Sequence, residues 1–379
     1  MKVPFCQIAR DQAPFEDELL AAAARVVRGG RWIGGPEVEA LERELGAFAG
    51  REAVACASGT DALVLALKAA GVGPGDKVVV PAFSFAASAG AVVLAGALPV
   101  FADVDEETFQ VSPATLEPVL APDVRALVAV SLFGRAAPCR GLGEVLRGAA
   151  PAAALVEDAA QSFGALRGGE RSCALSPYAA TSFYPTKPFG GFGDGGMVFL
   201  EAPAAAAEVR VLCDHGQTRR DHCERTGTNS RLDAIQAAML RVKFRRFAAL
   251  KKLRAAAAER YETLLSGAAR RGLLRLPGAD ADESPVWAQY VVRIPSRGDS
   301  PERRDALRRA LAADGIETAV HYSEPLHLQP AFARLDPGAR CPAAERLARE
   351  VLGLPIGPSL SPEEQEYVAE RLVARLETL

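Results

Sequence analysis

Residues 78–101 read Val78-Val-Val-Pro-Ala-Phe-Ser-Phe-Ala-Ala-Ser-Ala-Gly-Ala-Val-Val-Leu-Ala-Gly-Ala-Leu-Pro-Val-Phe101, and this stretch indicates how the chain folds. A valine-rich strand is followed by a helix-length run of small residues at 84–95 and a second strand at 98–101. Residues 82–101 carry no charge and are about as long as a bilayer-spanning helix. They consist largely of Ala, Gly and Ser, which favour membrane transfer only weakly. We therefore expect a buried helix and a strand in a soluble protein, with no membrane segment.

The same alternation of short strands and helices extends from about residue 50 to 200. Further strands are predicted at 126–130, 155–156 and 197–200, and a helix at 59–70. This order is typical of βα units around a mostly parallel sheet, and it predicts an α/β fold. Ligands of such sheets bind beyond the carboxyl ends of the strands.

The pattern changes after Asn229. Residues 233–265 are mostly helical, and a final helix is predicted from Pro362. A strand at 290–294 and a helix at 301–314 lie between them. A chain of 379 residues is long for a single core. We expect a large α/β domain over residues 1–245, whose N-terminal segment can pack on the second domain, and a small C-terminal α+β domain over residues 246–379.

The composition limits the classes of function. The 44 Lys and Arg residues nearly cancel the 47 Asp and Glu residues, leaving a net charge of −3. We therefore expect no nucleic-acid partner. The 7 cysteines are never spaced as CxxC and the 4 histidines are scattered, so we expect neither a disulfide framework nor a metal site. The first residues lack the apolar core of a signal peptide, which predicts a cytoplasmic protein.

The densest chemical signal is Thr181-Ser-Phe-Tyr-Pro-Thr-Lys187-Pro-Phe-Gly-Gly-Phe-Gly-Asp-Gly-Gly196. Lys187 is the only basic residue between positions 172 and 209, where the chain average predicts about four. Aromatic residues and prolines around an ammonium group desolvate it, which lowers its pKa and makes it a nucleophile and base. The alternative is an ordinary surface lysine beside a glycine-rich turn.

Two further segments carry suitable groups. Glu157-Asp158-Ala-Ala-Gln161 follows a buried strand, where the carboxylate of Asp158 suits a protonated ring nitrogen and Gln161 suits the same ring. The alternative for Asp158 is a helix N-cap. The segment 58–60 opens a predicted helix whose free N–H groups suit a phosphate, unless it is only a helix cap. A Schiff-base lysine, a carboxylate for a ring nitrogen and a phosphate cradle together match the needs of pyridoxal phosphate.

With these segments in view, the sequence resembles the sugar aminotransferases of the DegT/DnrJ/EryC1/StrS family, which are pyridoxal-phosphate enzymes of fold type I (aspartate aminotransferase-like). The resemblance covers nearly the whole chain, and its motifs are specific only when taken together. They are GRWIGGPEV (30–38), SGTDAL (58–63), EDAAQ (157–161), SFYPTK (182–187), GDGG (193–196), NSRLDAIQ (229–236) and HY (321–322) ahead of PLH (325–327).

The resemblance implies a role for each matching residue. Lys187 would bond covalently to pyridoxal phosphate, and Asp158 would pair with the pyridine nitrogen. Gln161 would contact the ring region, and Phe85 would stack on the ring. The phosphate would be bound by Ser58, Gly59, Thr60 and Ser182, joined by Asn229 reaching across from a second subunit. The enzyme would therefore be a homodimer with composite active sites.

Within the family, the sequence most resembles bacterial enzymes that aminate UDP-2-acetamido-2-deoxy-3-keto-D-glucuronate at C3, in the biosynthesis of O-antigen and lipopolysaccharide. Arg231 would then meet the sugar carboxylate, since a forked guanidinium suits a carboxylate. The alternative for Arg231 is an ion pair with Asp233 or Glu224. The sugar pocket would be lined by His321, Tyr322 and Tyr184, although ordinary packing is an alternative for the His-Tyr pair.

The implied reaction is a ping-pong transamination with L-glutamate as the amino donor. Phe85 and Glu324 lie at positions where the sequence departs from its relatives or where the relatives vary, so these positions do not fix the identity of the sugar substrate. The alternative substrate is a dTDP- or other NDP-linked 3- or 4-keto-deoxysugar. A hypothesis of another class is a cofactor-binding sensor without turnover. We expect such a sensor to need an added DNA-binding domain.

Overall fold

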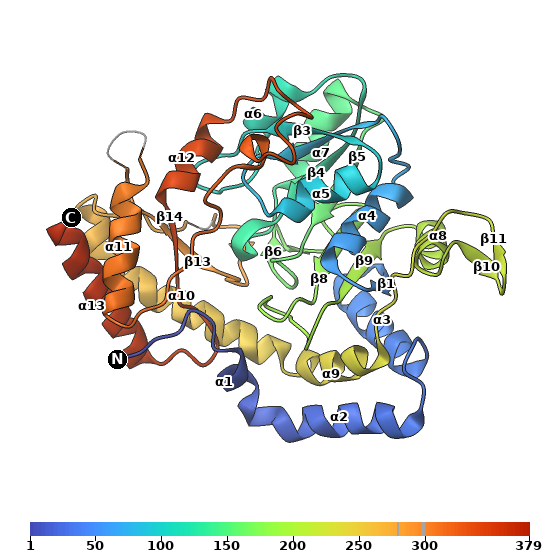
Figure 1. Ribbon diagram of the computed structural model, residues 1–379, viewed down its shortest axis with the longest axis horizontal. Helices are drawn as coiled ribbons and strands as arrows, with labels where there is room; N and C mark the ends of the chain where they lie inside the picture. The colour runs from blue at the N-terminus through green and yellow to red at the C-terminus, as the bar shows by residue number, and fades with distance from the viewer. Residues whose placement is uncertain (279, 297–299) are drawn as a thin grey trace.

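The computed structural model describes residues 1–278, 280–296 and 300–379. A seven-stranded sheet lies at the centre of the larger part, with helices around it (Figure 1). In spatial order its strands are β1 (Glu52–Cys56), β9 (Gly196–Leu200), β8 (Tyr178–Ser182), β5 (Ala154–Asp158), β4 (Val124–Val130), β2 (Lys77–Pro81) and β3 (Leu98–Ala102).

The sheet is mostly parallel, as the sequence predicts. Strands β8, β5, β4, β2 and β3 pair in parallel, and β9 is antiparallel to both of its neighbours, β1 and β8. The predicted strands correspond to β2, β3, β4, β5 and β9. The sequence analysis missed β1 and β8, because both are short and rich in alanine, which has a low intrinsic preference for strands.

Alternate residues of β1, β8 and β9 divide between two hydrophobic clusters. Ala53 and Ala55 of β1 join one cluster, and Val54 and Cys56 join the other. The first cluster includes buried residues of α2 (Glu16–Gly29), α3 (Pro36–Ala49) and α9 (Ala234–Phe244). The second includes buried residues of α4 (Gly59–Ala69), α5 (Ala86–Leu94), α7 (Cys139–Ala149) and α8 (Pro203–Cys213). The sheet is thus covered on both faces.

The charge-free run at 82–101 folds as predicted into a helix and a strand. Helix α5 covers most of the predicted helix, and β3 pairs in parallel with β2 along its whole length. Ala89, Ala91 and Val92 are completely buried in the protein core. Within the described residues, no helix combines the length and the apolar composition that crossing a membrane requires.

A third hydrophobic cluster lies in the C-terminal part. It contains residues of α10 (Phe247–Arg270), β13 (Tyr290–Arg293), α11 (Glu302–Ala313), β14 (Val351–Leu354) and α13 (Pro362–Thr378), together with Val3 from the N-terminus. Residues of α12 (Pro342–Glu350) join the cluster around α4 and α5 instead. The division of the chain at residue 245 stays a prediction.

The long helical stretch predicted from residue 233 is two helices. Helix α9 ends at Phe244, and α10 begins at Phe247. The rings of both phenylalanines contact Phe48, with centroid distances of 5.5 and 6.1 Å. Figure 1 shows α10 running from the sheet domain into the C-terminal part, where α11 and α13 lie. The remaining short elements of the described residues are two helices, four 3-10 turns and three short strand pairs. The helices are α1 (Ile8–Gln12) and α6 (Pro113–Leu116). Strand β6 (Leu166–Arg167) pairs with β7 (Glu170–Arg171) and β12 (Glu283–Ser284), and β10 (Gln217–Arg219) pairs with β11 (His222–Cys223).

Candidate active site

Lys187 lies in a tight loop that follows β8. The loop is closed by two backbone hydrogen bonds: Phe183 N donates to Gly195 O (2.8 Å), and Gly191 N donates to Phe183 O (2.6 Å). At Gly190 a Cβ atom would lie 2.5 Å from Pro185 O, so only glycine permits this turn. Lys187 N donates to Tyr184 O at 2.9 Å, which fixes the backbone under the amine.

The side chain of Asp158 faces this amine from the end of β5. The residue is buried, and its carboxylate accepts hydrogen bonds from Ser88 Oγ (3.0 Å) and Ala160 N (3.1 Å). The bond from Ala160 N belongs to a turn, because no helix begins in the described residues between β5 and Leu166; the predicted alternative of a helix N-cap is therefore wrong.

Lys187 and Asp158 form an electrostatic pair. Burial lowers the pKa of the Lys187 ammonium, and the negative charge of Asp158 opposes this shift. Burial raises the pKa of Asp158, and its two hydrogen bonds and the charge of Lys187 oppose that shift. The structure therefore places an amine with a lowered pKa beside a buried carboxylate, at the carboxyl edge of the sheet.

Gln161 links this edge to the C-terminal part of the chain. Its Oε1 accepts a hydrogen bond from Phe133 N at 2.8 Å, and its Nε2 donates to Tyr322 Oη at 3.1 Å. Burial raises the pKa of the Tyr322 hydroxyl well above its usual range, so the hydroxyl stays protonated. Tyr322 is thus held beside the Asp158 edge by a hydrogen bond, which ordinary packing alone would not require.

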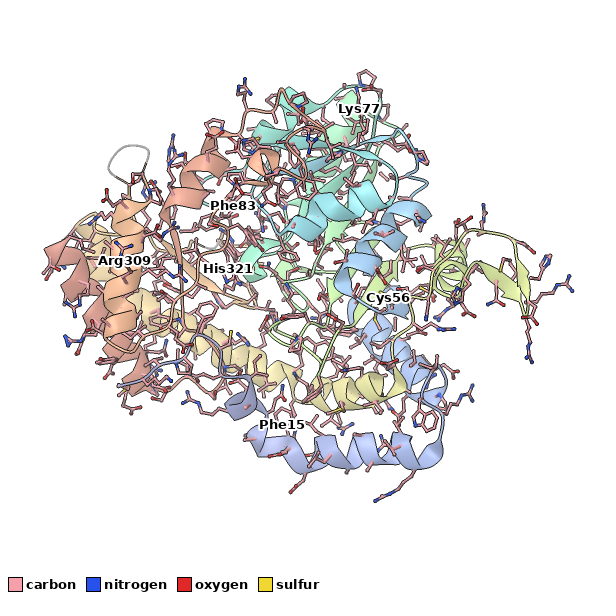
Figure 2. All side chains as sticks on the ribbon, in the orientation of Figure 1. Phe15, Cys56, Lys77, Phe83, Arg309 and His321 are labelled. Atoms are coloured by element: carbon pink, nitrogen blue, oxygen red, sulfur yellow. The ribbon has the colours of Figure 1, made fainter. Side chains whose placement is uncertain are left out.

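Aromatic side chains line the same region. The ring of Tyr322 lies 5.8 Å from that of Phe83 and 6.2 Å from that of Phe85. Phe83 is completely buried, whereas Phe85 is 56% exposed, so one face of its ring is available to a ligand. His321 and Phe83 lie near the middle of the molecule (Figure 2). Burial and the charge of Lys187 both lower the pKa of His321, and its buried Nε2 has no hydrogen-bond partner among the described residues.

The N-terminus of α4 approaches the end of β8. Ser58 caps this helix, because its Oγ accepts a hydrogen bond from Asp61 N at 3.0 Å. A Cβ at Gly59 would lie 2.5 Å from Ser182 Cβ, so the absence of a side chain lets the helix end reach Ser182. The first N–H groups of a helix have no intrahelical acceptor, and among the described residues those of Gly59 and Thr60 donate to no other group, so they are available to an anion.

Asn229 and Arg231 lie on a different segment, between the β10–β11 hairpin (Gln217–Arg219, His222–Cys223) and α9. In the described part of the chain, no hydrogen bond or ion pair joins either residue to Lys187, Asp158 or Gln161. Arg231 Nη1 donates to Asp214 Oδ1 at 2.7 Å. The predicted alternative of an ion pair was correct in kind but wrong in its partner, which is neither Asp233 nor Glu224. The side chain of Tyr184 is 51% exposed.

The sequence analysis missed Ser88, which donates to Asp158. Its Oγ also lies 2.8 Å from that of Ser84, four residues earlier and just before α5 begins. Both residues are buried, and they are the only polar residues of a stretch otherwise made of Ala, Gly, Val, Leu and Phe. Two hydroxyl residues spaced four apart in an apolar run are the sequence feature that could have predicted a buried polar contact for Ser88.

These residues fit pyridoxal phosphate. The lysine amine, the carboxylate and the N-terminus of α4 are three separate features at one edge of the sheet, and each matches one chemical part of that molecule. The buried, unpartnered Nε2 of His321 is a further polar atom that faces the region without a partner in the described chain. No group of three His, Cys, Asp or Glu side chains placed to hold a metal ion occurs among the described residues.

The sequence profile of the DegT/DnrJ/EryC1/StrS aminotransferase family matches residues 15–373. The chain belongs to this family. The predicted family, the fold class and the class of enzyme are confirmed. The family is described as one of aminotransferases, which favours an enzyme over the sensor hypothesis.

Individual relatives agree with this assignment. A UDP-2-acetamido-2-deoxy-3-oxo-D-glucuronate aminotransferase of Pseudomonas aeruginosa is 40% identical over 359 residues, which cover 94% of this chain and 96% of that protein. A dTDP-3-amino-3,4,6-trideoxy-alpha-D-glucose transaminase of Streptomyces venezuelae is 42% identical over 361 residues, which cover 95% of this chain and 92% of that protein. The crystal structure of S. venezuelae DesV in complex with a ketimine intermediate has a TM-score of 0.93 and 39% identity, and the match covers 100% of this chain and 99% of that chain. Other solved relatives are described in PLP and PMP forms.

Proposed function

We propose that this DegT-family enzyme transfers an amino group from L-glutamate to C3 of UDP-2-acetamido-2-deoxy-3-keto-D-glucuronate, with pyridoxal phosphate as its cofactor. The observation that carries the proposal is the pair formed by half-buried Lys187 and buried Asp158 at the carboxyl edge of the sheet. The similarity to the P. aeruginosa enzyme over 94% of the chain supports the choice of sugar.

Different residues of the chain have different roles in the proposed reaction. When bound, pyridoxal phosphate supplies an electron sink for the carbanion that forms on the substrate. Lys187 Nζ holds the cofactor at rest and later, as a free amine, accepts and returns the proton at the substrate carbon, which its lowered pKa favours. Asp158, buried and hydrogen-bonded to Ser88, would keep a proton on the ring nitrogen of the cofactor. Gly59, Thr60 and Ser182 bind the phosphate.

We assign the sugar carboxylate to Arg231. Its hydrogen bond to Asp214 uses Nη1, and its buried Nε has no partner among the described residues. The guanidinium is therefore oriented by Asp214 while it keeps donors for a second carboxylate. His321, Tyr322 and Tyr184 complete the proposed sugar pocket.

The test of this assignment is Arg231→Ala with two substrates, the 3-keto-glucuronate and the matching neutral 3-keto-glucosamine nucleotide. A charge-assisted pair is worth about 1.5–3 kcal/mol, so kcat/KM for the acidic sugar should fall about 10- to 100-fold, and for the neutral sugar much less. The control is Arg220→Ala, an exposed arginine of the neighbouring hairpin whose one ion pair among the described residues is with Asp221. An equal loss for both sugars would remove the carboxylate assignment.

A second candidate substrate is a dTDP-linked or other NDP-linked 3- or 4-keto-deoxysugar. The 42% identity to the S. venezuelae transaminase favours it. Turnover of a panel of nucleotide ketosugars separates the two, because a deoxysugar lacks the carboxylate that Arg231 would bind.

We further propose a cytoplasmic homodimer with composite sites, in which Asn229 of each subunit completes the phosphate site of the other. The exposed position of Asn229 supports this arrangement. A nucleotide-linked amino sugar is an activated building block, and we place the product in O-antigen and lipopolysaccharide biosynthesis.

A further inference from the structure

A chain of buried hydroxyl groups leads to the carboxylate of Asp158. Ser88 is the third residue of α5, and its Oγ donates to Asp158 Oδ2 at 3.0 Å. The Oγ of Ser84, just before the helix, lies 2.8 Å from the Oγ of Ser88. Ser84 is 2% exposed, Ser88 1% and Asp158 5%, so bulk water does not compete for these hydrogen bonds. The two hydroxyls and the carboxylate therefore form a closed chain of hydrogen bonds.

The direction of this chain follows from the number of protons in it. An ionised carboxylate only accepts hydrogen bonds, so the single proton of the Ser88 hydroxyl points at Asp158. The hydrogen bond between the two hydroxyls then has Ser84 as its donor. Both O–H dipoles point toward the carboxylate, and hydrogen bonds aligned in this way strengthen one another.

The chain does not run equally well in the opposite direction. A protonated Asp158 would donate to Ser88, and Ser88 would donate to Ser84, whose own hydroxyl proton would then need a different acceptor. Among the described residues, the hydrogen bond with Ser88 is the only one that the Ser84 hydroxyl makes. A buried hydroxyl proton without an acceptor costs free energy. The arrangement therefore favours the carboxylate of Asp158 over the carboxylic acid.

Other groups around Asp158 act on the same balance. Ala160 N donates to Oδ1 at 3.1 Å, and Ser88 lies in the first turn of α5, where the helix dipole favours negative charge. Burial opposes them, because it raises the pKa of Asp158. The positive charge of Lys187 lowers this pKa, but that charge changes as the amine binds and releases the cofactor. The hydroxyl chain is a support that stays in place throughout the reaction.

We propose that Ser84 and Ser88 are positioning residues that keep Asp158 ionised and aimed at the ring nitrogen of pyridoxal phosphate. The inference rests on the proposed function and deepens it, because it names the groups that decide where the proton between Asp158 and the ring nitrogen resides. With the chain intact, the proton stays on the nitrogen, and the ring withdraws electrons from the substrate. Without the chain, the proton moves from the nitrogen to the carboxylate.

The experiment measures the nitrogen-15 NMR shift of the ring nitrogen in holoenzyme loaded with labelled pyridoxal phosphate, since this shift separates a protonated from an unprotonated ring. The wild type should give the protonated signal. Ser88→Ala should move the signal toward the unprotonated position, and Ser84→Ala should move it the same way by less. In Ser88→Ala the kcat of the half-reaction with L-glutamate should fall about 10- to 100-fold, as expected for the loss of a hydrogen bond to a charged group, while KM changes little.

The matched control is Ser172→Ala. Ser172 is buried, donates to Glu157 Oε1 at 2.7 Å and lies 2.6 Å from the hydroxyl of a second serine, Ser162. This is the same pair of hydroxyls on the neighbouring carboxyl group of β5. Its loss should lower the melting temperature, as the loss of Ser88 does, but leave the ring signal and kcat as in the wild type.

A folded Ser88→Ala enzyme with the wild-type ring signal and kcat would overturn the proposal, and so would a wild-type ring nitrogen without a proton. An unchanged signal in Ser84→Ala would overturn the directional chain. That variant carries the test if Ser88→Ala does not fold, because Ser84 makes no hydrogen bond to Asp158 itself. A wild-type protein that takes up no cofactor would instead contradict the proposed function, so the two proposals fail differently.

Discussion

Two neighbouring carboxyl groups at the end of β5 have different surroundings. Asp158 faces the amine of Lys187, whereas Glu157 points into the protein. Glu157 accepts hydrogen bonds from Ser131 Oγ (3.1 Å), Ser172 Oγ (2.7 Å) and Cys173 N (2.9 Å). Burial outweighs these bonds and raises the pKa of Glu157 to about 7. At the residue scale, the sequence predicted a role for the first carboxyl and gave no sign of the second.

Glu157 makes stability depend on pH. Its pKa is about 7 in the folded chain against 4.5 for the free group, so the folded protein retains a proton that the unfolded chain has lost. Stability should therefore fall as the pH rises from about 5 to about 7, by about 3 kcal/mol from this residue, and change no further above it. Glu157→Gln, which is neutral at every pH, should flatten the fall when urea unfolding is measured between pH 5 and pH 8.

The control for this measurement is Glu52→Gln, an exposed glutamate at the start of β1. It should leave the pH dependence as it is in the wild type. A Glu157→Gln protein whose stability falls as steeply as that of the wild type would contradict the buried, protonated carboxyl.

At the scale of elements, the approach of α4 to β8 depends on one missing side chain. Gly59 opens α4, and a Cβ there would lie 2.5 Å from Ser182 Cβ, whereas Gly90 inside α5 has open space around the same position. Gly59→Ala should cost about 1–3 kcal/mol through overpacking and weaken binding of pyridoxal phosphate, because the helix end must move away from the phosphate. Melting temperature and cofactor titration measure the two effects.

Gly90→Ala is the matched control on a helix. Alanine is favoured over glycine in a helix interior, so this variant should be more stable by about 0.5–1 kcal/mol and bind the cofactor as before. Equal behaviour of the two variants would show that the contact between α4 and β8 does not limit the site.

At the scale of the whole molecule, several large apolar side chains are exposed. Trp32 and Phe85 are each 56% exposed, Ile33 is 51% exposed and Tyr184 is 51% exposed. Exposed aromatic residues of this kind are typical of interfaces. Together with the outlying position of Asn229, they agree with the proposed pairing of two subunits around composite sites.

Mixing two inactive variants tests the composite sites. One variant is Lys187→Ala, and the other carries Asn229→Asp and Arg231→Ala. If each site takes Lys187 from one subunit and Asn229 and Arg231 from the other, half of the dimers formed on co-refolding are hybrids with one intact site. About a quarter of the wild-type activity should return, because a closed dimer has two equivalent sites.

The control mixes each variant with itself, which should give no activity. A mixture that stays inactive, although hybrid dimers are detected by mass, would place all of these residues in one subunit's site.

The sequence by itself determined five strands of the central sheet and its mostly parallel character, and it singled out Lys187 and Asp158 as candidate site residues. Such features follow from local pattern and from residue types whose chemistry is distinctive. Alanine-rich β1 and β8 form strands because neighbouring strands supply their hydrogen bonds and burial: β9 pairs with both, and β5 pairs with β8. The bond of Ser88 to Asp158 and the partner of Arg231 were decided by the tertiary structure. Each joins residues from different parts of the chain, and no local pattern encodes which distant groups will share a buried space.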